Sequence, residues 1–244
     1  MNNQEYIVQG FVIKTVDYKE YDAIITCLTS DGIISFIAKG VNKLTSKNRV
    51  SCTLYAFSEF TLEKNKMNYY ILTKGRLINY NRFLYDSIDY MACVGLISES
   101  ILIFLDDKPS LTIYKLYKYL IDSINNFDIF TITSIFLAKI IVDTGYQLDT
   151  SSCVKCGKKN DIVFMSYNDG GFICNKCLTY NQEKQNVEYL KSIRYTFLVD
   201  ADNYYHYKLN KEIAIRIIKE YVLYLQDSFG YKELKTFEMF KNLY

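Results

Sequence analysis

The chain has 244 residues, of which 50% are hydrophobic, enough for one large core or two to three small ones. Its formal net charge of +2 excludes a basic field over the whole surface, so a nucleic-acid surface must come from local clustering. No apolar run approaches the roughly 18 residues of a membrane span, and no secretory signal follows Met1. The odd number of cysteines, 7, fits reduced thiols, and we expect a cytoplasmic protein.

The first 80 residues are rich in β-branched and aromatic residues and predict a β domain. Asp31-Gly32 is a hairpin signal between two such runs. The expected strands are Tyr6–Val16, Tyr21–Thr29, Ile33–Ala38, Ser51–Leu62 and Tyr69–Ile78. Five strands in so short a stretch predict a small closed barrel of the OB type, which we place at residues 1–80.

A polar stretch without acidic residues, 39–50, separates the third and fourth expected strands. Cations on a loop at a barrel mouth can neutralise phosphates, and aromatic side chains can stack on bases. The candidate DNA-binding residues are Lys14, Lys39, Lys43, Lys47 and Arg49, and the candidate stacking residues are Phe11, Tyr18, Tyr21, Phe36, Tyr69 and Tyr70. The alternative is that the aromatics belong to the core and the lysines form an ordinary solvated face.

The pattern becomes helical after residue 80. Ser110, after Pro109, is the expected N-cap of a helix over residues 111–124. Other helices are expected at 84–105, 127–144, 187–198, 211–229 and 232–242. The apolar face of the helix over 211–229 predicts core packing, with a partner groove as the alternative. Residues 81–150 and 179–244 are expected to form a mostly helical domain, which makes the chain an α+β protein.

Two C-x-x-C pairs lie inside this helical region: Cys153 with Cys156, and Cys174 with Cys177. Two such pairs can offer four thiolates to one tetrahedral ion, so we predict a single structural Zn²⁺ held by a module at residues 151–178. The alternative is a set of cysteines without metal. A catalytic zinc would need an open position or a histidine ligand, and His206 lacks the H-x-E pattern of a zinc deaminase.

The sequence contains no Walker loop, G-x-S-x-G, H-E-x-x-H or dinucleotide fingerprint. We therefore expect no catalytic residues and no nucleotide cofactor. Two alternatives stay open at this point. One is a nucleic-acid-modifying enzyme with an OB barrel and a structural zinc ribbon, and the other is a protein-interaction scaffold without nucleic-acid contact.

Several stretches in this order resemble one family. They are Gly10–Thr15, Tyr18–Asp22, Ala38–Val41, Gly145–Leu148 followed by the first cysteine pair and Gly157, and Tyr224–Gly230 followed by Lys235. Together they resemble the RecO family of bacterial recombinational-repair mediators. The basic loop departs from the family pattern, with Asn42 and Leu44–Ser46 where arginine, lysine or proline is common.

The resemblance implies a DNA-binding mediator of recombination and repair in the RecF pathway. Such a protein binds single- and double-stranded DNA through its OB fold and anneals complementary strands. It also implies partnership with RecR and with the C-terminal tail of single-stranded-DNA-binding protein, which together help to load RecA onto coated single strands. It implies neither a membrane partner nor an enzymatic activity.

Overall fold

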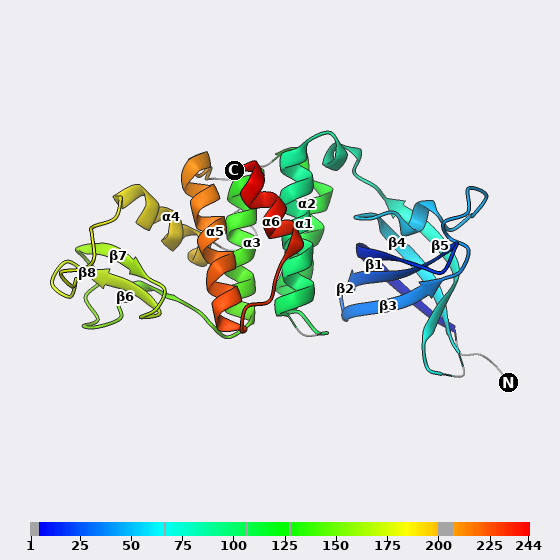
Figure 1. Ribbon diagram of the computed structural model, residues 1–244, viewed down its shortest axis with the longest axis horizontal. Helices are drawn as coiled ribbons and strands as arrows, with labels where there is room; N and C mark the ends of the chain where they lie inside the picture. The colour runs from blue at the N-terminus through cyan, green and yellow to red at the C-terminus, as the bar shows by residue number, and fades with distance from the viewer. Residues whose placement is uncertain (1–4, 66, 106, 127, 200–206) are drawn as a thin grey trace. The chain divides into compact units, whose positions relative to one another are not determined.

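The computed structural model describes residues 5–65, 67–105, 107–126, 128–199 and 207–244 (Figure 1). The chain packs as two compact units, residues 1–87 with 106–125 and residues 88–105 with 126–244. These units divide the chain differently from the ranges expected above, whose assignment to functional domains stays a prediction. His206 lies outside the described residues.

The first unit contains a closed five-stranded barrel with the strand order β1-β2-β3-β5-β4. Its strands are β1 (Glu5–Tyr18), β2 (Asp22–Thr29), β3 (Gly32–Ala38), β4 (Phe57–Lys64) and β5 (Tyr70–Asn79). The long strand β1 closes the barrel, because its first half pairs with β4 and its second half pairs with β2. The other closing edge is the short parallel pairing of β3 with β5. This order confirms the predicted OB barrel.

Alternating residues of the strands fill the barrel. Ile25 and Phe36 are paired across β2 and β3 and are almost fully buried, and the Phe36 ring lies 4.8 Å from that of Phe60 on β4. The paired residues Ala23 and Ala38 also point inward. The residues between them on β2 and β3 therefore face outward, since successive side chains of a strand alternate between its two faces.

Helix α2 (Leu111–Asp122) packs in the same unit as the barrel. Its predicted cap is confirmed, because the Ser110 hydroxyl accepts a hydrogen bond from the backbone N–H of Ile113. The ring of Tyr117 lies 5.4 Å from that of Phe11, which is stacked in turn on Phe57 at 4.6 Å. Phe11 is therefore a packing residue.

The second unit is built around α3 (Ile129–Asp143), which is buried along nearly its whole length. Figure 1 shows it between α1 (Ile88–Phe104) and α5 (Lys211–Ser228), and it also contacts α4 (Val187–Leu198). The predicted core role of α5 is confirmed, because Ile217, Tyr221 and Leu225 are fully buried. None of the helices in the described ranges is long and apolar enough to cross a membrane.

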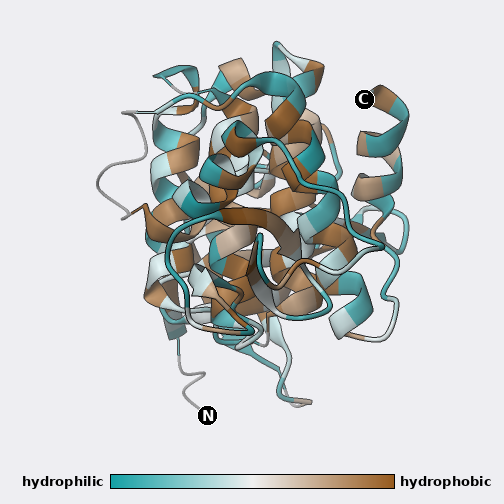
Figure 2. Cartoon of the chain, turned by 90° about the vertical axis from the view of Figure 1, so that its left-hand side faces the viewer, coloured by the Kyte–Doolittle hydropathy of each residue, from teal (hydrophilic) through white to brown (hydrophobic). Residues whose placement is uncertain are grey.

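The C-terminal helix α6 (Lys235–Leu243) packs on α1. Hydrophobic and hydrophilic residues alternate along it, as Figure 2 shows for the helix that ends at the C-terminus. Phe237 and Phe240 are its buried residues, and the backbone N–H of Thr236 donates to the carboxylate of Glu99 on α1. The sequence stretch predicted as the last helix is therefore an amphipathic packing element.

Three short strands form the cysteine module of the second unit. They are β6 (Asp149–Cys153), β7 (Ile162–Ser166) and β8 (Gly171–Cys174), in the order β6-β8-β7. With this module, the predicted α+β architecture of a barrel, a helical part and a four-cysteine cluster is confirmed.

Candidate functional site

The topology of the cysteine module brings the two C-x-x-C pairs together. Strands β6 and β8 are parallel neighbours, and each ends at the first cysteine of a pair, Cys153 or Cys174. Because the carboxyl ends of parallel strands meet at one edge of a sheet, both turns leave the sheet at the same edge. Each turn folds back over its first cysteine, with the N–H of Cys177 donating to the carbonyl of Cys174 at 3.0 Å.

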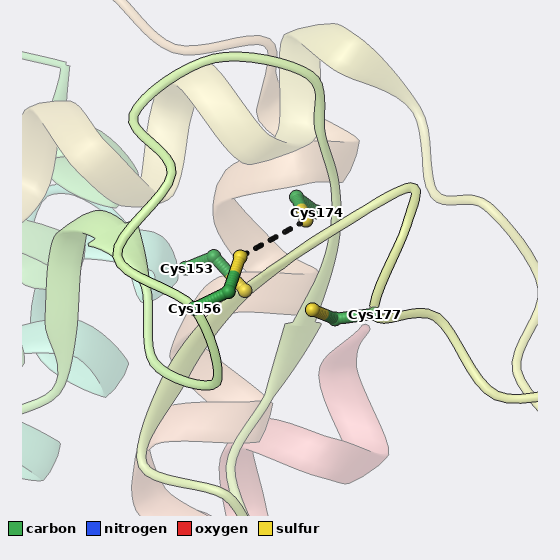
Figure 3. Close-up of side chains that lie close together, drawn as sticks. All are labelled: Cys153, Cys156, Cys174 and Cys177. Atoms are coloured by element: carbon green, nitrogen blue, oxygen red, sulfur yellow. Dashed lines mark hydrogen bonds between the residues drawn. The ribbon is translucent and has the colours of Figure 1, made fainter.

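The four sulfurs lie within 4.8 Å of one another, and those of Cys156 and Cys174 are 3.6 Å apart (Figure 3). A tetrahedral ion with Zn–S bonds of about 2.3 Å separates its sulfurs by about 3.8 Å. The cluster is therefore of the right size for such an ion. Cys153 and Cys174 are buried, whereas Cys156 is exposed.

The electrostatics of the cluster favour a bound cation. Burial raises the pKa of Cys153, but the N–H groups of Cys174, Lys155 and Cys156 outweigh burial and lower that pKa to about 6. The pKa of Cys177 is raised to about 12, chiefly by hydrogen bonding to Cys156. The cluster alone thus favours the thiolate of Cys153 and disfavours that of Cys177, and a cation bound among the sulfurs would favour the thiolate form of Cys177.

The turn after the first pair depends on Gly157. Its φ of 75° lies in the left-handed region, which a side chain disfavours. In this conformation its N–H donates to the carbonyl of Cys153 at 2.8 Å. The sequence signal of a glycine directly after the second cysteine therefore marks a real constraint of the turn.

Glu220 on α5 ties the cysteine module to the helical core. Its carboxylate accepts hydrogen bonds from the hydroxyls of Tyr167, in the turn after β7, and Tyr189 on α4, and it pairs with Arg216 at 2.8 Å. Tyr189 is buried and Tyr167 is half-buried, so loss of this acceptor removes the hydrogen bonds that both hydroxyls make to the carboxylate.

Replacing this acceptor is expected to destabilise the helical unit. Glu220→Ala is expected to cost about 2–4 kcal/mol of unfolding free energy, as several donors lose their partner. Glu220→Gln keeps an acceptor oxygen and is expected to recover part of that loss. Denaturant unfolding measures both variants, and equal stability of Glu220→Ala and wild type would contradict the expectation.

The barrel is where the structure places the five predicted DNA-binding residues. Lys14, Lys39, Lys43, Lys47 and Arg49 are all exposed. Within the described ranges, none of them forms an ion pair. Lys14 lies on β1, and the other four lie on the segment of residues 39–50, which we call the basic loop.

The strand register places Lys14 on the outer face of the barrel. Lys14 pairs with Thr26, and Thr26 pairs with Ser35, to whose hydroxyl it is also hydrogen-bonded at 2.9 Å. Val16 and Tyr18 share this face, because they alternate along β1 with Thr15 and Asp17. This outer face of β1, β2 and β3 therefore presents a cation, an exposed apolar residue and an exposed aromatic ring.

The basic loop adjoins this face and is held in a fixed conformation. Gly40 donates its N–H to the carboxylate of Asp22 at 2.7 Å. The side-chain amide of Asn42 donates to the carboxylate of Asp17 at 3.0 Å. At the other end of the loop, the Asn48 side chain accepts from the N–H of Gly75 on β5 at 2.9 Å. The carboxylates of Asp17 and Asp22, which lie next to the cations, therefore accept hydrogen bonds from the loop.

The end of the basic loop packs closely on β5. A Cβ added at Gly75 would lie 2.1 Å from the hydroxyl of Ser51, the residue after the loop. Gly75→Ala is therefore expected to lower the unfolding free energy by about 1–3 kcal/mol. Ser51→Ala in the same chain removes the clashing oxygen and is expected to restore part of the stability, which a double-mutant cycle measures. Additive losses would contradict the predicted contact.

The six predicted stacking residues fall into three groups. Tyr70 is half-buried and packs against the barrel core. Phe11 and Phe36 are buried core residues. The prediction that they stack on bases is wrong, because their rings are enclosed. Tyr18, Tyr21 and Tyr69 are exposed and open to a ligand. The Lys43 ammonium lies 5.2 Å from the ring centre of Tyr21, which places a cation beside an exposed aromatic surface.

Sequence reasoning missed Lys19, at the tight turn between β1 and β2. Its ammonium lies 5.1 Å from the ring centre of Tyr18, in the same arrangement as Lys43 over Tyr21. OB folds bind ligands with the face of strands 2 and 3 and with the loop between strands 1 and 2. The signal that could have found Lys19 is its place in the turn between the first two expected strands.

Comparisons with known proteins agree with this architecture. A family profile described as "Recombination protein O N terminal" matches residues 1–81, and one described as "Recombination protein O C terminal" matches residues 85–227. The chain belongs to the recombination protein O family. The RecO resemblance stated from the sequence is thereby confirmed.

Two relatives illustrate the extent of the RecO match. The DNA repair protein RecO of Clostridium kluyveri is 26% identical over 242 residues, which cover 96% of this chain and 93% of the relative. The DNA repair protein RecO of Caldicellulosiruptor bescii is 30% identical over 192 residues, covering 76% of this chain and 77% of the relative. The match therefore spans the barrel and the helical part.

Proposed function

We propose that this chain is a DNA-binding mediator of recombination and repair. In this proposal the barrel binds single- and double-stranded DNA, and Lys14, Lys39, Lys43, Lys47 and Arg49 contact phosphates. The observation that carries the proposal is the outer barrel face with its fixed basic loop, where exposed cations adjoin exposed tyrosines and form no ion pair with any residue the structure describes. Membership of a family whose relatives are named DNA repair proteins supports it.

The proposed action is the annealing of complementary strands. Two strands repel each other through their phosphates, and a cationic surface that neutralises both lowers that repulsion. Exposed tyrosines can hold unpaired bases by stacking. No covalent bond breaks in this process, so the proposal requires neither a catalytic residue nor a nucleotide cofactor.

The proposed partners follow from the family. They are RecR and the C-terminal tail of single-stranded-DNA-binding protein, with which the chain would help to load RecA onto coated single strands in the RecF pathway. We also propose that Cys153, Cys156, Cys174 and Cys177 hold one structural Zn²⁺, which their mutual distances accommodate. The reduced thiols and the DNA substrate fit a cytoplasmic, nucleoid-associated protein.

A strand-annealing assay tests the proposal. Complementary oligonucleotides are mixed with the full chain, with and without single-stranded-DNA-binding protein, and duplex formation is followed by fluorescence energy transfer. We expect annealing to accelerate in both cases and to slow as salt rises. No acceleration together with magnesium-dependent strand processing would favour the nucleic-acid-modifying enzyme instead.

A further inference from the structure

A small cavity lies between the cysteine module and helix α4 of the second unit. Its volume is about 180 Å³, the space of about six water molecules. Residues from the module form one wall, and one face of α4 forms the other. The residues that matter here are Lys159, Asp161, Ile162, Leu190, Lys191 and Arg194.

Arg194 is held in one orientation but is not fully paired. Its Nε donates to the carbonyl of Thr150 at 2.8 Å, and its guanidinium lies over the ring of Phe172, 5.2 Å from the ring centre. Its Nη2 is buried and has no hydrogen-bond partner in the described part of the protein. Buried N–H groups nearly always have partners, so this donor is an unsatisfied group of a residue that lines the cavity.

The charges around the cavity select an anion. Lys191 lies one turn before Arg194 on the same face of α4, and Lys159 approaches from the module. Both lysines are exposed, and neither forms an ion pair within the residues that can be described. The one carboxylate in the lining, Asp161, is already paired with Lys158 at 3.5 Å.

We propose that this cavity binds a phosphate group of a nucleic-acid strand, as a contact in addition to the barrel. Arginine presents a planar fork of N–H donors that matches phosphate geometry, and Arg194 lines the cavity together with Lys159 and Lys191. Ile162 and Leu190 give the cavity an apolar lining for the adjoining sugar. This inference rests on the proposed DNA-binding function and deepens it, because one chain then holds DNA through both of its units.

The test uses the full chain with its metal and a fluorescent single-stranded oligonucleotide. Lys159→Gln with Lys191→Gln removes two cations from the cavity, whereas Lys184→Gln with Lys235→Gln removes two exposed cations elsewhere in the same unit. Affinity is measured over a range of salt concentrations. We expect the cavity variant to lose about 1.4 from the slope of log affinity against log salt, since each contact to a single strand contributes about 0.7. The slope for the control variant should fall much less.

Arg194 is tested separately, because its contacts with Thr150 and Phe172 are also structural. Arg194→Lys keeps the charge but loses the fork and the hydrogen bond to Thr150, so we expect weaker DNA binding at an unchanged zinc content and a somewhat lower thermal midpoint. Inorganic phosphate is expected to compete with the oligonucleotide more effectively for wild type than for the cavity variant. Unchanged DNA affinity of Arg194→Lys would contradict the assigned role of the fork.

Failure of this inference can be told apart from failure of the proposed function. If wild type binds no DNA, the proposed function fails and the inference fails with it. If wild type binds DNA but the cavity variant and the control variant have the same slope of log affinity against log salt, only the cavity assignment is overturned. Loss of phosphate or acidic-peptide binding in the cavity variant, with DNA binding unchanged, would also overturn it.

Discussion

Removal of the metal is expected to unfold the cysteine module. The module has three short strands, and its two turns are held mainly by hydrogen bonds around the four cysteines. For structural zinc sites the binding free energy is of the order of 10 kcal/mol and is largely folding free energy. After treatment with a chelator, backbone amides of residues 149–178 should exchange with solvent rapidly, while those of the barrel should not change.

Cysteine variants give the matched control for this prediction. Cys174→Ser replaces a buried member of the cluster and should abolish the stoichiometric zinc. Cys93→Ala removes a buried cysteine on α1 that lies outside the cluster and should retain about one zinc per chain. Elemental analysis measures the zinc content of both variants. An absence of zinc from wild type purified without chelators would contradict the metal assignment.

Neutralising the basic loop is expected to weaken DNA binding strongly. The combined variant Lys39→Gln, Lys43→Gln and Lys47→Gln removes three exposed cations without touching the Asn48 anchor. If each lysine contacts one phosphate, the salt slope for single-stranded DNA falls by about 2, and the affinity at low salt falls about 10- to 100-fold. Fluorescence anisotropy over a salt series measures both quantities.

The control for the loop variant changes the charge by the same amount in the same unit. Lys74, Lys108 and Lys115 are exposed and lie outside the basic loop. Their combined replacement by glutamine should reduce affinity only through the change in net charge, which is a weak effect at moderate salt. Equal losses in the two triple variants would show that general charge, and not the loop, determines binding.

The barrel could be predicted because its strands have clear local signals. Alternating apolar residues and the Asp31-Gly32 turn predict β2 and β3 nearly to the residue. The fourth strand was expected from Ser51, but it begins at Phe57, and Val50–Cys52 is a short helical turn. The reason is tertiary, because the loop end is fixed by Asn48 and packed on Gly75, and both contacts involve β5.

The four-cysteine cluster could be predicted from spacing alone, since both C-x-x-C pairs are local motifs. The strands that bring the pairs together could not, because the module is short and polar and has little hydrophobic alternation. The cavity beside α4 also could not be predicted from the sequence. It depends on how the cysteine module packs against α4, and no local pattern identifies that packing.

The central claim is that DNA lies on the outer barrel face and the basic loop, with the metal holding a separate module. Hydrogen exchange of the full chain with and without a single-stranded oligonucleotide tests it most directly. The account predicts slower exchange on DNA binding at residues 39–50 and at the turn between β1 and β2. It would be contradicted if DNA bound tightly but slowed exchange only within residues 126–244.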